Sequence, residues 1–243
     1  MTSSDARVAI VTGAATGQGL ATAKSFHSAG YTVALVDLDH RVIDAASSIG
    51  DRAAGVVADI AEISGWDTIM AHIEETSGRL DVLVNNAGVY RRGAIETMPV
   101  EDIDLLYRVN QRAMILGVRA ALPYLTMSPN AAIVNISSSA GITGDPEIVA
   151  YTGTKWAVRG ITKSLAAELA LHRIRVNCVI PGLIDTAMAV ANGDSVNQKI
   201  IDRTFLHRIG EPDEVASATT FLASAGASYI TGSEIVVDGG LSV

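Results

Sequence analysis

The chain has 243 residues, of which 49% are hydrophobic and 18% charged, a balance that favours one folded domain with a well-buried core over a disordered chain. Its 18 basic and 26 acidic residues give a formal net charge of -8 without any basic run, which argues against nucleic acid as the main partner. No apolar run reaches the roughly 18 residues that span a bilayer, and the histidines show no metal-ligand spacing, so we expect neither membrane association nor a bound metal.

Short β-branched runs alternate with longer stretches of helical periodicity, for example over residues 20–29, 102–122 and 158–171. Nearly continuous apolar strands imply that helices cover both faces of a parallel sheet. The pattern predicts a single α/β domain over residues 1–243, a doubly wound Rossmann fold with a seven-stranded parallel sheet flanked by helices on both faces. The expected strands are 7–11, 32–36, 55–58, 81–84, 132–136, 174–180 and 234–237.

Glycines and polar residues follow the predicted strands. The carboxyl ends of parallel strands meet at one edge of a sheet, where ligands bind, so these residues mark a site. They are Gly13, Asp37, Asp59, the Asn85 to Gly88 run, Ser138, Pro181 and Gly182. The least regular stretch, 184–198, contains Asn192-Gly193-Asp194, and we expect a loop or a substrate lid there, within 183–203.

Gly13, Gly17 and Gly19 form a G-x-x-x-G-x-G turn between the first predicted strand and a helix. Missing side chains allow a tight turn and a close approach of the backbone, so amides and a helix N-terminus can hold a pyrophosphate. A purely structural turn remains the alternative for this motif taken alone.

Asp37 ends the second predicted strand, where a carboxylate accepts hydrogen bonds from both adenosine ribose hydroxyls and repels a 2′-phosphate. The glycine turn holds no lysine or arginine, and we interpret Arg41 as a helix-face residue. The predicted cofactor is therefore NAD and not NADP.

Tyr151 and Lys155 are four residues apart. If Tyr151 begins a helix, the phenol and the ammonium share one face, and the cation favours phenolate, which predicts a general acid/base with a lowered pKa. The alternative is an ordinary exposed helix pair.

The chain contains six short motifs: T-G-A-A-T-G-Q-G at 12–19, N-N-A-G at 85–88, V-N at 109–110, N-I-S-S-S at 135–139, Y-T-G-T-K at 151–155 and P-G-L-I-D-T at 181–186. In this order and spacing, the motifs resemble those of the short-chain dehydrogenase/reductase family. The resemblance runs from Val8 to the C-terminus. It departs from the family at Gln18, where an aliphatic residue is usual; we expect little effect.

The resemblance implies a catalytic group of Asn110, Ser138, Tyr151 and Lys155. Tyr151 would be the acid/base, and Ser138 would donate a hydrogen bond to the substrate oxygen. Lys155 would hold the nicotinamide ribose and help to lower the pKa of the phenol. Asn110 would bend its helix and hold a water that passes protons to the lysine. The alternatives without a catalytic role are a strand-end cap for Ser138 and a core amide for Asn110.

The same resemblance implies further cofactor contacts. Asp59 and Ile60 would meet the adenine, although Asp59 is also a candidate helix N-cap. Ile184 and Thr186 would contact the carboxamide. The full expected set is Gly13, Thr16, Gln18, Gly19, Asp37, Asp59, Ile60, Asn86, Ala87, Gly88, Tyr151, Lys155, Pro181, Gly182, Ile184 and Thr186.

These features predict an NAD-dependent oxidoreductase that interconverts a secondary alcohol and a ketone. Apolar residues of the expected lid, from Met188 to Ala191, favour a hydrophobic substrate such as a hydroxysteroid, a cyclic alcohol or an aromatic alcohol. The alternatives are an NADP-dependent 3-ketoacyl-carrier-protein reductase and a catalytically idle NAD-sensing module. By resemblance we expect a homotetramer.

Cysteine usage indicates where the protein resides. Cys178 is the single cysteine, so no internal disulfide can form, and its apolar strand predicts a buried structural thiol. The first residues, Met-Thr-Ser-Ser-Asp, lack the basic and apolar segments of a signal peptide. We expect a cytoplasmic protein.

Overall fold

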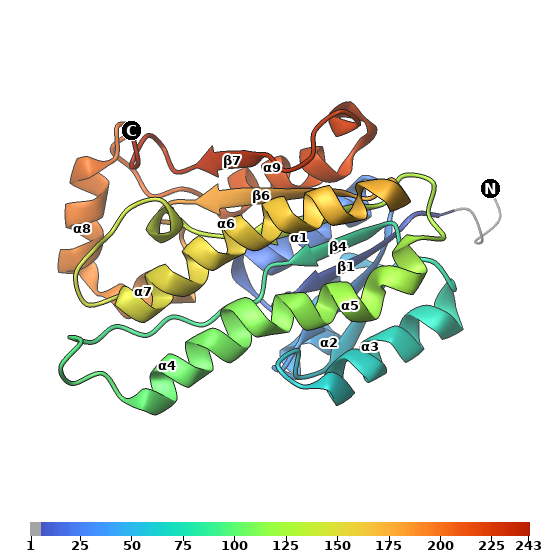
Figure 1. The fold of residues 1–243 in the computed structure, drawn as a ribbon, viewed down its shortest axis with the longest axis horizontal. Helices are drawn as coiled ribbons and strands as arrows, with labels where there is room; N and C mark the ends of the chain where they lie inside the picture. The colour runs from blue at the N-terminus through green and yellow to red at the C-terminus, as the bar shows by residue number, and fades with distance from the viewer. Residues whose placement is uncertain (1–5) are drawn as a thin grey trace.

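The computed structural model describes residues 6–243 and contains one sheet of seven parallel strands. Its strand order is β3-β2-β1-β4-β5-β6-β7, and Figure 1 shows helices packed in front of and behind this sheet. The strands are β1 Val8–Thr12, β2 Thr32–Asp37, β3 Ala53–Val57, β4 Val82–Asn85, β5 Ala132–Ile136, β6 Arg175–Pro181 and β7 Glu234–Val237. Each begins within two residues of its predicted start, so the doubly wound α/β fold is confirmed.

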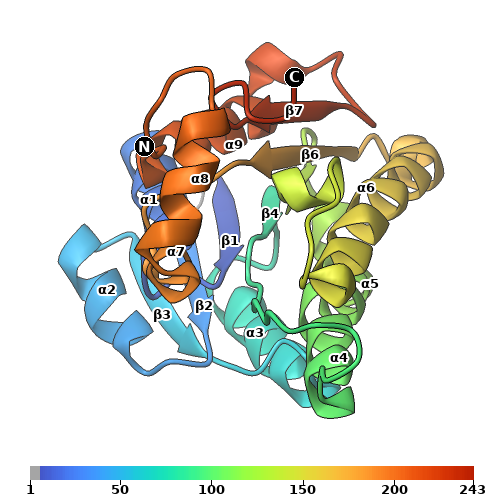
Figure 2. The ribbon, with the colours of Figure 1, turned by 90° about the vertical axis from the view of Figure 1, so that its left-hand side faces the viewer.

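Helices cover both faces of the sheet because the strands are apolar on both sides. Side chains of α3 (Ile63–Thr76), α5 (Ala113–Leu125) and α6 (Val149–Leu169) pack on one face in one core cluster. Side chains of α1 (Gly17–Ser28), α2 (Arg41–Ile49) and α9 (Pro212–Ala223) pack on the other. Figure 2 shows these two layers on either side of the strands. The result is the three-layer arrangement that a parallel sheet requires.

The predicted helix over 102–122 is one long helical segment with a local change of pitch. It begins as α4 (Val100–Tyr107), passes through a π-helical turn at Arg108–Arg112 and continues as α5. A π turn carries an extra residue and is frequent at functional sites. Asn110 lies within it.

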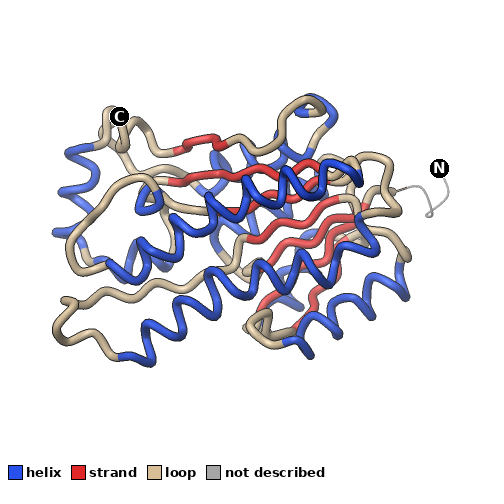
Figure 3. Tube along the Cα trace, in the orientation of Figure 1, coloured by secondary structure: helices blue, strands red, loops and turns tan. Residues whose placement is uncertain are grey.

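The segment expected as an irregular lid is helical, so that detail of the prediction was wrong. It forms α7 (Ala187–Asn192) and α8 (Asp194–Arg203), which are joined at Gly193, where φ is +81°. Figure 3 shows these helices beyond the end of the sheet, next to the C-terminus. They stand over the edge at which the strands end, where the site was expected.

The strand order turns at β1 and places the sequence motifs together. β1 pairs with β2 on one side and with β4 on the other, so the chain runs away from β1 in two directions. A crevice forms outside the carboxyl ends of strands at such a switch point. Asn85 at the end of β4 lies opposite Asn135 in β5, and the two amides hydrogen-bond at 2.8 Å.

Candidate active site

The glycine turn between β1 and α1 fits a close backbone approach. Gly13 and Gly17 have φ of +67° and +57°, values that side chains rarely adopt. A Cβ on Gly13 would lie 2.8 Å from the Cα of Ala87, and a Cβ on Gly19 would overlap the Gly13 carbonyl. These glycines are therefore required by space and by backbone conformation.

The loop after β4 braces this turn through Thr12, a residue that the sequence analysis did not single out. The Thr12 hydroxyl accepts hydrogen bonds from the amides of Asn86 and Ala87 at 3.1 and 3.0 Å. The Asn86 side-chain amide in turn donates to the Thr12 carbonyl at 2.8 Å. The two strand ends that would flank a dinucleotide are thus held at a fixed spacing.

Asp37 lies at the end of β2 as predicted, facing the same turn. Its carboxylate accepts from the amides of Ala15 and Asp39, each at 3.0 Å. Arg41 forms a 2.6 Å ion pair with Asp39, at the surface. Arg41 is therefore engaged away from Asp37, in agreement with its interpretation as a helix-face residue.

A cleft of about 480 Å³ runs along this edge from Asp37 past the glycine turn to Tyr151 and Lys155. Most of the predicted cofactor residues line it: Gly13, Thr16, Gln18, Gly19, Asp37, Asp59, Ile60, Asn86, Ala87, Gly88, Tyr151, Lys155 and Thr186. The Asp59 carboxylate accepts a hydrogen bond from the Ala61 amide at 2.8 Å. The helix α3 begins only at Ile63, and its N-cap is Glu62. Asp59 therefore closes a tight turn and does not cap the helix. The cleft is suited to an extended dinucleotide, because glycine backbone without side chains lines its centre and the Asp37 carboxylate lies at one end.

The proposed catalytic side chains meet where this cleft ends. Tyr151 and Lys155 lie on the first turns of α6, and both are buried, with 6% and 4% of their surface exposed. This excludes the alternative of an exposed helix pair. The Lys155 ammonium donates to the Ile136 carbonyl at 3.0 Å and lies 5.7 Å from the centre of the Tyr151 ring. Ser138 caps a short 3-10 turn after β5 and accepts from the Ala140 amide at 3.2 Å.

Burial dominates the acid–base properties of this group. It raises the pKa of Tyr151 to about 12, and a hydrogen bond from Ser138 opposes the rise. Burial also lowers the pKa of Lys155 to about 8. The sequence predicted a lowered phenol pKa, which is wrong for the protein alone, because desolvation of the buried phenol outweighs its neighbours.

The Asn110 side chain forms hydrogen bonds to the chain next to the catalytic group. Its side-chain oxygen accepts from the Val89 amide at 2.8 Å, and its amide donates to the Val89 carbonyl at 2.9 Å and to the Thr154 hydroxyl at 3.3 Å. The side chain therefore joins the π turn, the loop after β4 and α6. This fixes the relative positions of three elements that carry site residues.

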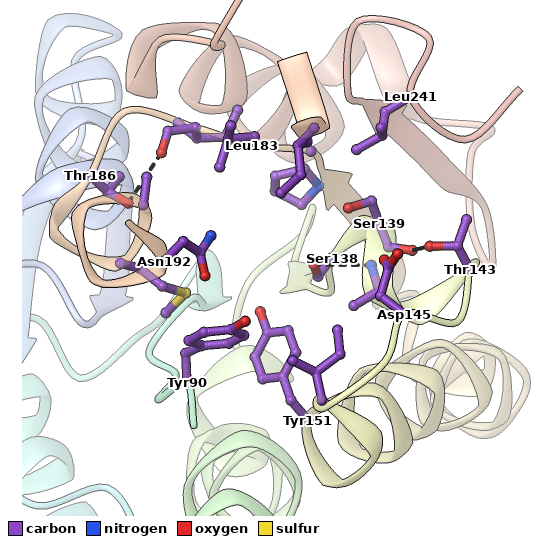
Figure 4. Close-up of a pocket in the computed structure, with 18 of the residues that line it drawn as sticks. Tyr90, Ser138, Ser139, Thr143, Asp145, Tyr151, Leu183, Thr186, Asn192 and Leu241 are labelled. Carbon is purple, nitrogen blue, oxygen red and sulfur yellow. Dashed lines mark hydrogen bonds between the residues drawn. The ribbon is translucent and has the colours of Figure 1, made fainter. Parts of the chain in front are cut away.

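A second cavity, of about 130 Å³, adjoins the cleft beneath α7 and α8. Figure 4 shows the hydroxyls of Tyr90 and Tyr151 pointing into it, and the two rings meet edge to face at 5.0 Å. Tyr90 was not predicted as a site residue, and only its place after N-A-G hinted at it. Pro181, Gly182 and Ile184, which we expected at the cofactor, line this cavity and not the cleft.

The 183–203 segment, which was expected to form a lid, contributes fewer apolar side chains to the cavity than predicted. Met188 and Ala189 line the cavity, whereas Val190 is 75% exposed and points away with Ala191. Asn192 also lines it, at the end of α7. Two of the four apolar residues from Met188 to Ala191 therefore line the cavity, and the lining is of mixed polarity.

Three further features of residues 6–243 bear on the chemistry of the protein. Among residues 6–243 no group of three or more His, Cys, Asp or Glu side chains could hold a metal ion. Over the same residues, each helix is too short or too polar to cross a membrane. Cys178 is fully buried in β6, and burial raises the pKa of its thiol to about 12, which suits a structural residue.

Comparison with known proteins agrees with this geometry. Residues 13–242 match the family model described as enoyl-(acyl carrier protein) reductase. The cyclopentanol dehydrogenase of Comamonas testosteroni is 36% identical over 96% of this chain and 96% of its own. A 3-ketoacyl-(acyl-carrier-protein) reductase from Brucella melitensis complexed with NADH superposes with a TM-score of 0.92, at 34% identity over 98% of each chain. A gluconate 5-dehydrogenase from Burkholderia cenocepacia J2315 in complex with NADP and tartrate also has a TM-score of 0.92, at 31% identity, with 98% of this chain and 96% of that chain covered.

Proposed function

This chain belongs to the short-chain dehydrogenase/reductase family, and from that premise we propose that it is an NAD-dependent enzyme that interconverts a secondary alcohol and a ketone. One observation carries the proposal. Ser138, Tyr151 and Lys155 are packed together where a cleft suited to a dinucleotide meets a small separate cavity. The cleft and the cavity share the Tyr151 side chain, so a reacting carbon in the cavity would lie next to both the cofactor and the acid/base.

The bound nicotinamide would supply or accept the hydride. Tyr151 would hold the proton that a ketone oxygen receives, because burial keeps its phenol protonated. The Ser138 hydroxyl would donate to the same oxygen as negative charge develops on it. Lys155, with a pKa of about 8, can carry a positive charge next to the phenol near neutral pH and so favour transfer of the proton. Asn110 would act as a positioning residue through Val89 and Thr154.

The choice of NAD rests on Asp37. A carboxylate at the end of β2 accepts hydrogen bonds from ribose hydroxyls and repels a 2′-phosphate. Arg41, the basic side chain that follows it, is paired with Asp39. The related structures contain NADH in one case and NADP in the other, so the local charge at Asp37 carries the argument.

The cavity favours a compact substrate. Its volume of about 130 Å³ is well below the 300–1,000 Å³ that is usual for drug-sized ligands. A single ring fits this space better than the four fused rings of a steroid, so we favour a cyclic alcohol among the hydrophobic candidates. The similarity to a cyclopentanol dehydrogenase supports this choice.

A second candidate is reduction of a ketoacyl group on a carrier protein, which the similarity to the Brucella melitensis reductase favours. A carrier-bound chain would have to reach Tyr151 through the cavity that α7 and α8 line. The third candidate, an NAD sensor without chemistry, would leave the grouping of Ser138 with the buried Tyr151 and Lys155 without a purpose.

We further propose a homotetramer. Large apolar side chains are exposed on α4, α5 and α6 and again on α9 and β7, namely Tyr107, Ile115, Val149, Trp156, Phe221 and Val236. Such side chains mark surfaces that another subunit would cover. Sedimentation equilibrium would contradict this proposal by giving the mass of a monomer. The lone buried thiol is in keeping with a cytoplasmic location.

NADH absorbance tests the enzyme proposal directly. The purified protein would be supplied with NAD or NADP and with cyclic, aromatic, aliphatic and steroidal secondary alcohols, and in reverse with NADH or NADPH and a ketoacyl thioester. We expect turnover of compact cyclic alcohols with NAD. Faster turnover of the thioester with NADPH would favour the second candidate, and binding of NADH without any turnover would favour the sensor.

A further inference from the structure

The cavity beneath the lid contains a buried hydrogen-bond acceptor without a partner. The side-chain oxygen of Asn192 is shielded from solvent, and among the described residues 6–243 nothing donates to it. Asn192 is the last residue of α7 and lines the cavity; in Figure 4 it lies on the side opposite Ser138. A buried acceptor left unsatisfied is costly to the fold, so its presence in a ligand cavity requires an explanation.

Two asparagines between residues 183 and 203 have a buried side-chain oxygen without a partner, Asn192 and Asn197. Asn197 on α8 donates its side-chain amide to the Ala189 carbonyl at 2.8 Å, which joins α8 to α7, and it does not line the cavity. Asn192 does line the cavity. Its oxygen, unlike that of Asn197, is therefore open to a ligand in the cavity.

The cofactor is not a suitable partner for this oxygen. Gln18 also has a buried side-chain oxygen without a partner, but Gln18 lines both the dinucleotide cleft and the cavity, so either ligand could satisfy it. Asn192 lines the cavity only. A donor for Asn192 must therefore come from the substrate.

The charge of the cavity restricts what that substrate is. Asp145 and Arg203 are the charged residues that line it, and they form a 3.2 Å ion pair between the loop before α6 and the end of α8. Their charges compensate each other, so the lining offers no free cation to an acid and no free anion to an amine. A neutral donor, which in an alcohol is a hydroxyl group, is the best match for the Asn192 oxygen.

We propose that the substrate is a compact neutral diol or hydroxyketone, whose second hydroxyl does not react and donates to the Asn192 side-chain oxygen. This inference rests on the proposed dehydrogenase function and narrows its substrate class. The reacting carbinol lies at Tyr151 and Ser138, and the second hydroxyl lies across the cavity at the end of α7. A site built to bind a hydroxyl discriminates strongly against the analogue that lacks it, because its own polar group is then left unpaired.

The test compares cyclohexanol with the 1,2-, 1,3- and 1,4-cyclohexanediols, with kcat and KM measured separately for each. The wild-type protein should prefer at least one diol over cyclohexanol by about tenfold or more in kcat/KM. Asn192→Leu, which has a similar shape and no polar atom, should remove that preference, so that the ratio of kcat/KM for the preferred diol to kcat/KM for cyclohexanol falls to about one. Asn192→Asp, which keeps an acceptor, should retain most of it.

Val190→Leu is the matched control, because Val190 is on the same helix and 75% exposed. It should keep the wild-type ratio of diol to cyclohexanol. Equal use of cyclohexanol and all three diols by the wild type, or a preference that survives in Asn192→Leu, would overturn the inference and leave the dehydrogenase proposal intact. Turnover of no alcohol at all would overturn the dehydrogenase proposal, and the inference with it.

Discussion

Replacement of Lys155 by methionine should stabilise the protein in the absence of cofactor. Burial lowers the pKa of Lys155 from 10.5 to about 8, and a difference of this size costs the charged form about 3 kcal/mol on folding at pH 7. Methionine fills a similar volume without charge. It loses the bond from the ammonium to the Ile136 carbonyl, worth about 1 kcal/mol, so the net gain in unfolding free energy should be about 2 kcal/mol.

The effect should depend on pH with a defined sign. Between pH 8 and 10.5 the unfolded state binds more protons at this site than the folded state, so wild-type stability rises with pH across that window. The cost of burying Lys155 should fall to about 1 kcal/mol at pH 10, and the advantage of the variant should then disappear. Urea unfolding of both proteins at pH 7 and pH 10 measures this difference.

Lys163→Met is the matched control, since Lys163 is on the same helix, is 61% exposed and pairs with Glu234 at 3.4 Å. Its effect on unfolding free energy should stay within about 0.5 kcal/mol. A Lys155→Met protein that is less stable than wild type at pH 7, or whose advantage does not shrink toward pH 10, would refute the reasoning about burial.

Two further substitutions test the cofactor cleft. Asp37→Asn removes the charge at the end of β2. The ratio of kcat/KM with NAD to kcat/KM with NADP should therefore fall by about tenfold or more. An unchanged ratio would show that Asp37 does not select the cofactor. Gly19→Ala places a Cβ against the Gly13 carbonyl, so NADH affinity, followed by fluorescence titration, should drop by more than about tenfold. Gly160→Ala, which meets open space on α6, should bind as wild type does, and equal affinity in both variants would contradict the assignment of the turn.

Structural features that depend on residues close together in the sequence could be predicted. β-branched runs bounded by glycine and aspartate located the strands, and the spacing of Tyr151 and Lys155 placed both on one side of α6. The parallel order then brought Gly13, Asp37 and Ser138 to one edge without further assumptions. These inferences depend on local propensity and on the topology rules of parallel sheets.

Features set by packing were not predictable. The pKa of Tyr151 depends on how much water the surrounding elements exclude, and no spacing of residues reports that. The lid was expected to be irregular because of Asn192-Gly193-Asp194, yet Gly193 only separates two helices, and the alanines before it were the overlooked helix signal. Which of Val190 and Asn192 faces the cavity follows from that helix, so the role of Asn192 became visible only in three dimensions.

The central claim is that Tyr151 is the acid/base of a working dehydrogenase, and the most direct test is Tyr151→Phe. We predict that this variant binds NADH with wild-type affinity, because only one oxygen is removed, while turnover of the best alcohol falls by at least about a hundredfold. Tyr229→Phe, at a fully exposed tyrosine, should retain wild-type turnover. A Tyr151→Phe protein that keeps most of its activity would contradict the account.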